Sequence, residues 1–235
     1  MNIKAAFSLE PRWRTHLDEI AARVGAIRVE DRALPLAIRA VSDQYNQRQF
    51  AIRWTPGALG ARLHFFLPRD QAKIAAAIRD IRVADLNRES PIRVLDYGCG
   101  IGASALGLVR GLRARGVESD VSIDLYDADA AATKLASDVL SRLPKVATGP
   151  ISRVGDDRYD LIVLGQVLVE IAGSVSEAAS VDRVFRTLNE LTRQNLAPDG
   201  RIIIVEPALR ESTRRLQTLR DKVVSAGLAH VIAPC

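Results

Sequence analysis

Residues 92–109 read IRVLDYGCGIGASALGLV, and this stretch decides the fold of the chain. The apolar run at 92–95 predicts a short buried strand, and the run at 103–109 predicts the first turns of a helix. The turn between them is rich in glycine, which supplies unusual backbone angles and leaves clearance for a ligand. A strand, a glycine-rich turn and a helix in this order allow a nucleotide-like ligand to approach the helix N-terminus.

The turn contains three alternating glycines, Gly98, Gly100 and Gly102, with Cys99 between the first two. A plain strand-to-helix turn needs fewer, so the pattern favours ligand binding. We predict that Asp96, at the end of the strand, accepts hydrogen bonds from a ligand amine or from neighbouring backbone. The stretch also fits the dinucleotide pattern G-x-G-x-x-G/A. That pattern usually opens a domain, whereas roughly 90 residues of different character precede it here.

The whole string D-x-G-x-G-x-G, with its leading acid, resembles the first motif of S-adenosylmethionine-dependent methyltransferases. The resemblance implies that S-adenosylmethionine, rather than a nicotinamide dinucleotide, binds at this turn. The residues that it places at the cofactor are Asp96, Gly98, Cys99, Gly100 and Gly102.

The string at 121–127 predicts the second strand, which ends in Asp127. In nucleotide-binding sheets an acid at this point binds the ribose hydroxyls, typically about 20 residues after the glycines. Asp127 lies 29 residues after Gly98, and a longer first helix with a loop at 116–120 accommodates the difference. Asp129 is the competing candidate. We predict that Asp127 binds the ribose and that Asp129 caps the next helix.

The string at 159–166 contains the fourth strand, whose carboxyl end faces the reaction centre in an open α/β sheet. We predict that Gln166 contacts the cofactor or the substrate, and Glu170 follows one helical turn later. Helix capping and solvation explain both residues equally well. The Asn/Asp-Pro-Pro-aromatic motif of amino-methylating nucleic-acid enzymes is absent here. Neither Cys99 nor Cys235 is placed as a nucleophile, so the catalytic residues stay unassigned.

After a polar break at 87–91, strands and helices alternate. The alternation predicts a doubly wound α/β fold with a mostly parallel, Rossmann-like sheet in residues 89–235, preceded by a helical segment at 1–88. In that segment we predict helices on the stripe Leu17, Ile20, Ala21 and Val24, at 34–45 and from Pro68, with a turn at 53–57. The predicted strands of the domain are 92–96, 121–127, 150–154, 160–165, 201–205 and 229–232, and its helices are 103–115, 130–142, 178–195 and 211–226.

Composition predicts a cytoplasmic protein without a membrane segment. The chain is 48% apolar with a mean hydropathy near zero, and no apolar run approaches the length that spans a bilayer. Its N-terminus carries no secretory signal. The cysteines Cys99 and Cys235 are too few for a disulfide framework, which favours a reducing compartment.

The basic surplus lies ahead of the glycine turn. Residues 1–93 carry a net charge of +6 and residues 94–235 a net charge of −1, within an overall +5. Arginine provides 28 of the 33 basic residues, and its planar head suits phosphate recognition. We therefore expect contact with RNA through this segment, although an arginine-rich coding bias would give the same excess.

The string LAPDGRIIIVEPALR at 196–210 resembles one methyltransferase-like family that associates with the small subunit of bacterial-type and mitochondrial ribosomes. Further marks of that family are Phe65 to Asp70, the pair Arg214-Arg215, the string 219–221 and the ending Val231 to Cys235. The resemblance implies a class I methyltransferase fold, S-adenosylmethionine, and a role on the small ribosomal subunit or its RNA. It also implies an iron–sulfur cluster in some members, whose first cysteine follows Ala-Pro.

The chain departs from this family at its end. It stops at Cys235, and one cysteine cannot hold a cluster that needs about four thiolates. We therefore expect no metal on this chain, with Cys235 an orphan cluster ligand and a cluster only in a longer chain. The seventh strand, which normally inserts between the fifth and sixth, has no residues to form it. Residues 229–235 should pair with 201–205, stay loosely placed at the sheet edge, or be completed from outside.

Three function hypotheses follow. The first is an rRNA methyltransferase or methyltransferase-like assembly factor acting on the small ribosomal subunit, which rests on the family resemblance and the basic segment. The second is a small-molecule methyltransferase in which the N-terminal helices form a lid. The third is a non-catalytic protein that binds the cofactor, because no catalytic motif is present. The sequence names no methyl acceptor and no oligomeric state.

Overall fold

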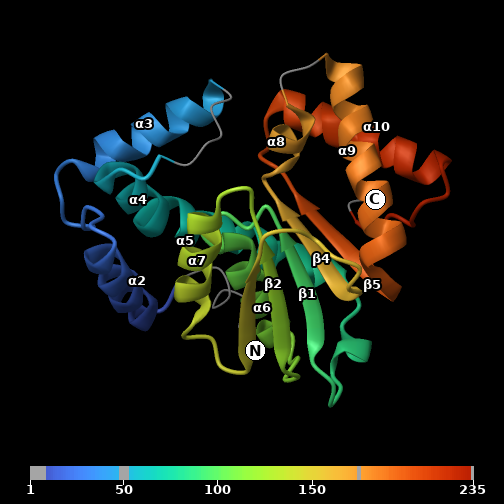
Figure 1. Cartoon of the computed structure of the whole chain (residues 1–235), viewed down its shortest axis with the longest axis horizontal. Helices are drawn as coiled ribbons and strands as arrows, with labels where there is room; N and C mark the ends of the chain where they lie inside the picture. The colour runs from blue at the N-terminus through green and yellow to red at the C-terminus, as the bar shows by residue number, and fades with distance from the viewer. Residues whose placement is uncertain (1–8, 48–52, 174–175, 234–235) are drawn as a thin grey trace.

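One parallel sheet organises the molecule, for which the computed structural model describes residues 9–47, 53–173 and 176–233. Five strands follow the order β3-β2-β1-β4-β5, and helices lie on both faces (Figure 1). The order reverses between β1 and β4, the point at which doubly wound sheets bind ligands. The predicted Rossmann-like α/β fold is confirmed. The strands are β1 (Ile92–Tyr97), β2 (Val121–Tyr126), β3 (Val146–Ile151), β4 (Tyr159–Gly165) and β5 (Leu196–Val205).

Successive residues of the central strands face opposite layers of the core, as the period of two in a strand requires. Val94 of β1 packs in the layer with α6 (Ala103–Ala114) and α7 (Ala130–Leu140), whereas the next residue, Leu95, packs in the opposite layer. That second layer contains α8 (Leu168–Ala172), α9 (Glu177–Glu190) and α10 (Arg210–Ser225).

The N-terminal helices share the first of these layers. Trp13, Leu17 and Ile20 are buried in the same hydrophobic cluster as Val94 of the sheet. The ring of His16 also reaches α7, with Nε2 3.1 Å from the carbonyl oxygen of Val139. The elements of this segment are α2 (Pro11–Arg23), α3 (Leu34–Asn46), α4 (Pro56–Ala61), η1 (Arg62–Phe66), α5 (Leu67–Ala77), η2 (Ile78–Asp80) and η3 (Ala84–Leu86).

The helix around Pro68 is longer than the sequence predicts. Pro68 stands in the first turn of α5, but α5 continues directly from α4 and η1. Residues 53–57, predicted as a turn, therefore contain the N-cap and first turn of α4. Because Pro68 has no N–H, the helical hydrogen-bond ladder is interrupted there. The π turn η1, in which the Leu67 N–H bonds the carbonyl of Arg62, widens the helix just before it.

Four further elements differ from the predictions. β5 begins at Leu196, five residues before the predicted strand at 201–205. β3 spans Val146–Ile151 rather than 150–154, because it pairs with β2 from Val121 onward. It lies at the sheet edge, where Pro150 is tolerated since one side of the strand needs no N–H donor. The short helix α8 is not predicted at all. The predicted helix at 178–195 ends in a separate π turn, η4 (Leu191–Asn195).

The predicted sixth strand at 229–232 is wrong. None of the described residues after α10 belongs to a strand, and Val231 and Ile232 are 41% and 52% exposed. An apolar run becomes a strand only when a neighbouring strand can pair with it, and among the described residues no strand lies between this run and the edge of β5. Gly227, at φ +59°, ends α10 in the left-handed conformation that is usual after helices.

α10 itself docks as predicted. Leu219 is 1% exposed, and Leu216 and Val223 are partly buried against the same hydrophobic cluster. The spacing of these residues places them on one face of the helix. The docked helix starts at the carboxyl end of β5, so its first turn lies at the ligand-binding edge of the sheet.

The contact between α5 and α6 predicts a steric sensitivity at Gly107. A Cβ at Gly107 would lie 2.2 Å from the carbonyl oxygen of Gln71. Gly107→Ala should therefore destabilise the protein by about 1–3 kcal/mol through overpacking, less the roughly 1 kcal/mol that alanine gains in helix propensity. Urea unfolding measures the change. Gly155→Ala is the matched control, because nothing lies within 4 Å of its Cβ position. Equal midpoints for the two variants would contradict the close helix contact.

Candidate functional site

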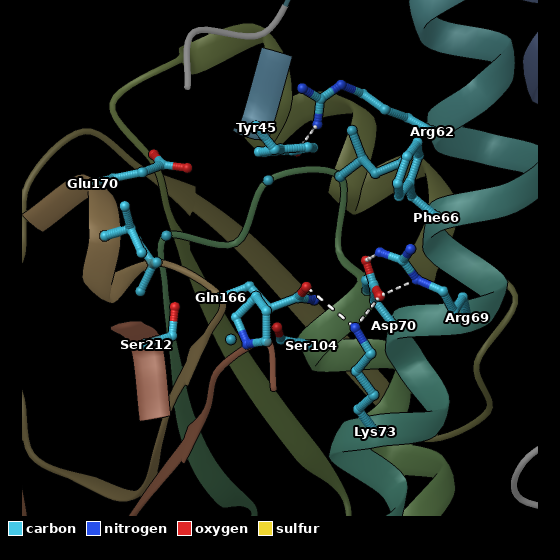
Figure 2. A pocket seen from close by; sticks show the side chains of 18 of the residues that line it. Tyr45, Arg62, Phe66, Arg69, Asp70, Lys73, Ser104, Gln166, Glu170 and Ser212 are labelled. Carbon is cyan, nitrogen blue, oxygen red and sulfur yellow. Dashed lines mark hydrogen bonds and ion pairs between the residues drawn. The ribbon is translucent and has the colours of Figure 1, made fainter. Parts of the chain in front are cut away.

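A cavity of about 920 Å³ lies at the carboxyl ends of the strands. Its floor is formed by the glycine turn after β1 and by the residues that follow β2, β4 and β5. Its other side is formed by α3, η1 and α5 of the N-terminal segment (Figure 2). Ligand pockets in proteins are about 300–1,000 Å³, so this cavity is at the large end of the range.

The glycine turn has the backbone geometry that the sequence predicts. Gly98, Gly100 and Gly102 all have positive φ, and Gly102 is the N-cap of α6 at φ +89°. A Cβ at Gly98 would lie 2.4 Å from Cγ2 of Val167, so a larger residue does not fit there. The N–H groups of Gly98 and Cys99 both donate to the carbonyl of Tyr126, which fixes the turn against β2.

Asp96 joins the strand to the helix from inside the core. Its Oδ2 accepts the Ala105 N–H at 2.9 Å, and its side chain is 0% exposed. Asp96 thus accepts a backbone hydrogen bond, as predicted. It caps the start of α6, because the N-cap residue Gly102 has no side chain to do so. Its Oδ1 has no partner among the described residues. Asp96 does not line the cavity, so its predicted contact with the cofactor stays a prediction.

The pKa of Asp96 is raised to about 7, mainly by burial. The hydrogen bond from the Ala105 N–H lowers it, and the charge of Asp127 contributes a smaller increase. Cys99 lines the cavity, but its side chain is 3% exposed. Burial also raises the pKa of the Cys99 thiol far above its ordinary value. A thiol in this state is not a nucleophile, in agreement with the sequence analysis.

Of the two roles predicted for Asp127 and Asp129, the structure confirms the helix cap at Asp129. Asp129 is the N-cap of α7, because its Oδ1 accepts the Ala131 N–H at 2.9 Å. Asp127 lines the cavity and accepts the Gly100 N–H at 2.8 Å, so it connects the second strand to the glycine turn. Its other oxygen accepts the Asp129 N–H at 2.9 Å. Ribose binding by Asp127 stays a prediction, and its carboxylate is in place for it.

Gln166 directly follows β4 and has a strained backbone conformation, with φ +61°. Such a φ is uncommon outside glycine and is found at ligand sites. The Gln166 side chain lies in the cavity, where its Oε1 accepts a hydrogen bond from Nζ of Lys73 at 3.3 Å (Figure 2). Lys73 also pairs with Asp70 at 2.8 Å. This network ties α5 to the end of the fourth strand.

A second polar contact closes the far side of the cavity. Arg62 of η1 is 8% exposed and donates from Nη1 to the hydroxyl of Tyr45 in α3 at 2.7 Å. Its guanidinium also stacks over the Tyr45 ring, 5.4 Å from the centroid. Both side chains line the cavity (Figure 2). Two N-terminal helical elements are therefore joined directly above the strand ends.

Two carboxyl groups with raised pKa values, Glu170 and Glu206, lie just after β4 and β5 in the chain. Glu206 follows β5, and its Oε1 accepts the Leu168 N–H at 3.0 Å. Glu170 of α8 faces the cavity (Figure 2). Partial burial raises the pKa of each to about 7, and the negative charge of Asp127 and of Glu206 also raises the pKa of Glu170. Carboxyl groups that titrate near neutral pH are suited to proton transfer.

Sequence reasoning missed Lys73, Arg62 and Tyr45 as cavity residues. They lie on helices of the first 88 residues, which have no glycine-rich turn and no strand beside them in the sequence. Arg215 is noted in the sequence only as part of a basic pair, and the structure places it in the cavity wall.

No metal site is visible in the part of the chain that the structure describes, since no three His, Cys, Asp or Glu side chains there form a group that could hold an ion. Cys235, the predicted orphan cluster ligand, lies outside the described residues. Over the same described ranges, no helix is both long enough and apolar enough to cross a membrane.

Comparison with known proteins gives one family match. A family model described as a methyltransferase domain matches residues 53–233. No curated protein matches the chain.

Three solved structures illustrate what the chain resembles. The S-adenosylmethionine-bound amino pentose methyltransferase CalS10 from Micromonospora echinaspora, involved in calicheamicin biosynthesis, is 18% identical with a TM-score of 0.38, over 73% of this chain and 58% of that chain. A putative sarcosine dimethylglycine methyltransferase from Galdieria sulphuraria is 15% identical with a TM-score of 0.40, over 66% and 54%. A putative class I S-adenosylmethionine-dependent methyltransferase from Listeria monocytogenes is 12% identical with a TM-score of 0.42, over 92% and 80%. The chain thus spans little more than half the length of the first two.

The raised pKa of Asp96 predicts a pH-dependent cost to stability. An aspartate in the unfolded chain has a pKa of about 3.9, so between that pH and about 7 the folded state binds more protons. Stability from this group therefore falls as pH rises through that window. Asp96→Asn keeps an oxygen for the Ala105 N–H and removes the charge. The urea midpoint of Asp96→Asn, relative to that of the wild type, should therefore be higher at pH 8 than at pH 5. Parallel pH curves for the two proteins would refute the assignment.

Proposed function

The chain belongs to a family of methyltransferase domains, and from this premise we propose that it transfers a methyl group from S-adenosylmethionine to a small molecule held inside the cavity. The observation that carries the proposal is the shape of the site. One cavity extends from the glycine turn to the ends of β4 and β5, and the N-terminal helices cover it. It has room for a cofactor at one end and a small acceptor at the other.

The cofactor end is the glycine turn. Asp127 offers a carboxylate for the ribose hydroxyls, next to the backbone of Gly100 that it already holds. The methionine part would lie over the glycine turn toward Gln166, where nothing lies within 4 Å of the Cβ position of Gly100. S-adenosylmethionine, when bound, supplies a methyl group on a sulfonium sulfur.

The acceptor end lies over β4 and β5, where Glu170 faces the cavity. An acceptor nucleophile has to lose a proton on methylation, and a carboxylate with a pKa of about 7 suits this task. We assign Glu170 to accept that proton. Tyr45 and Arg62 line the cavity on the side of the N-terminal helices and would reduce the access of water.

The cavity lies between the N-terminal helices and the carboxyl ends of the strands, and its size favours a small acceptor over RNA. The basic surplus of the first 93 residues also provides less free charge than the count implies, because several of its arginines pair with acids of the sheet domain. These ion pairs are Arg23–Asp138 at 3.0 Å, Arg88–Asp160 at 2.5 Å and Arg93–Asp157 at 2.9 Å. Cationic side chains that are already paired contribute less to phosphate binding.

The small ribosomal subunit is the second candidate acceptor, and it rests on the resemblance of 65–70 and 196–210 to the ribosome-associated family. A third reading, cofactor binding without catalysis, rests on the missing catalytic motif. Methyl-labelled S-adenosylmethionine separates the three. Label in a small-molecule extract supports our proposal, label in 30S RNA supports the ribosomal candidate, and binding without transfer supports the third.

Cofactor binding provides the first prediction. S-adenosylhomocysteine should bind in calorimetry, whereas NAD should not. Asp127→Ala should weaken the binding by roughly 1.5–3 kcal/mol, the value of a charged hydrogen-bond pair. Asp156→Ala is the matched control, because Asp156 is an exposed acid just before β4, at the opposite edge of the sheet. Binding of NAD alone, or equal affinity in both variants, would overturn the assignment.

Proton transfer provides the second prediction. With the acceptor found by labelling, kcat/KM should rise with pH through about 7 in the wild type. Glu170→Gln should lose this rise and lower kcat by roughly 10²–10⁴-fold. Its affinity for S-adenosylhomocysteine should stay unchanged. Glu177→Gln, an exposed acid at the start of α9, is the control. An unchanged pH profile in Glu170→Gln would exclude Glu170 as the base.

A further inference from the structure

The N-terminus of α10 forms part of the cavity wall. Leu209 and Ser212 line the cavity, and Figure 2 shows Ser212 in the first turn of α10 beside it. The N-cap residue is Leu209, so no side chain caps the helix. The N-terminus of a 16-residue helix carries a partial positive charge and favours a negatively charged group. This feature alone does not define a site.

Arg215, one turn into the same helix, provides the second observation. Its side chain is only 9% exposed, yet it lines the cavity. Its Nε and Nη1 have no hydrogen-bond partner within the residues that the structure describes. Buried guanidinium donors without partners are costly, because they lose water and gain nothing in return. The planar head of arginine matches the two oxygens of a carboxylate or phosphate.

Glu206 is the carboxyl group next to this arginine. Burial raises the pKa of Glu206, and the positive charge of the nearby Arg215 acts in the opposite direction, but no ion pair joins the two within the described ranges. Oε1 of Glu206 is bound to the Leu168 N–H, and Oε2 has no partner in the described structure. Glu206 does not line the cavity, so its carboxyl group leaves the Arg215 donors free for a ligand. Glu211, which is in the cavity wall, is exposed at the start of the helix.

On the premise of the proposed methyltransferase function, we propose that Arg215 and the N-terminus of α10 bind a carboxylate or phosphate group of the methyl acceptor. The acceptor is then a small organic acid or phosphate ester. Because Arg215 is recessed in the wall, a terminal anionic group reaches it, whereas a phosphate inside a polynucleotide backbone carries a sugar on each side and does not.

The position of α10 separates this subsite from the cofactor. The glycine turn follows β1, and α10 follows β5, with β4 between the two strands. An anion at Arg215 therefore lies over the β5 end of the cavity, beyond Gln166. Glu170, on α8 between these two ends, is in place to face the reacting atom of an acceptor anchored in this way.

The probes are sodium benzoate, its neutral counterpart benzamide, and inorganic phosphate. Each is titrated against the protein, with and without saturating S-adenosylhomocysteine, and binding is followed by saturation-transfer NMR and calorimetry. We expect benzoate or phosphate to bind and benzamide not to bind. Tighter binding of benzoate identifies a carboxylate acceptor, and tighter binding of phosphate identifies a phosphate ester. Equal binding of benzoate and benzamide would overturn the proposal.

The variant pair is Arg215→Met and Arg214→Met, because Arg214 is exposed on the same helix and does not line the cavity. Arg215→Met should weaken binding of the anion at least about tenfold, the loss of one charged hydrogen-bonded contact. Arg214→Met should leave it unchanged. Arg215→Lys keeps the charge and should retain part of the affinity. It replaces Arg215→Met as the test variant if thermal melts show that Arg215→Met is unfolded.

The two proposals fail in different ways. If S-adenosylhomocysteine does not bind but benzoate binds through Arg215, the methyltransferase function is wrong and the anion site stands. If S-adenosylhomocysteine binds and neither anion does, the anion site is wrong. If Arg215→Met loses S-adenosylhomocysteine instead of the anion, Arg215 holds the cofactor and this inference is overturned.

Discussion

The hydrogen bond from the Ala105 N–H to the buried carboxyl of Asp96 is the interaction on which the site depends. It fixes the start of α6 against the end of β1, at a turn where Gly102 offers no side chain for capping. Asp127 repeats the device one strand away, because it holds the Gly100 N–H. Two acids at neighbouring strand ends thus hold the glycine backbone in the conformation that leaves space above it.

Three carboxyl groups are buried or partly buried around this turn and the cavity. Asp96, Glu170 and Glu206 all have pKa values raised to about 7 by burial near the cavity. Asp96 uses its carboxyl group for the turn and not for the cavity. Glu206 holds the Leu168 N–H, and Glu170 faces the cavity. Of these three carboxyl groups, only Glu170 lines the cavity.

The N-terminal helices complete the site and are not a separate unit in their packing. α2 shares the core of the sheet, and α5 lies close enough to α6 that Gly107 has no space for a Cβ. This rigid contact places Lys73 beside Gln166, and the continuous helix from α4 to α5 carries Arg62 to Tyr45. These contacts form the side of the cavity that faces the strand ends, and the proposal of a small acceptor rests on them.

The sequence by itself determined the parallel sheet, the glycine turn and the cap at Asp129, because each follows from neighbouring residues: apolar runs, glycines at alternate positions and an acid before a helix. The local pattern was insufficient at 229–232, since a strand needs a partner that the sequence run does not contain. Only the tertiary structure placed Arg215 and Lys73 in the cavity. Their positions depend on how helices from distant parts of the chain pack over the strand ends, and no local spacing encodes that packing.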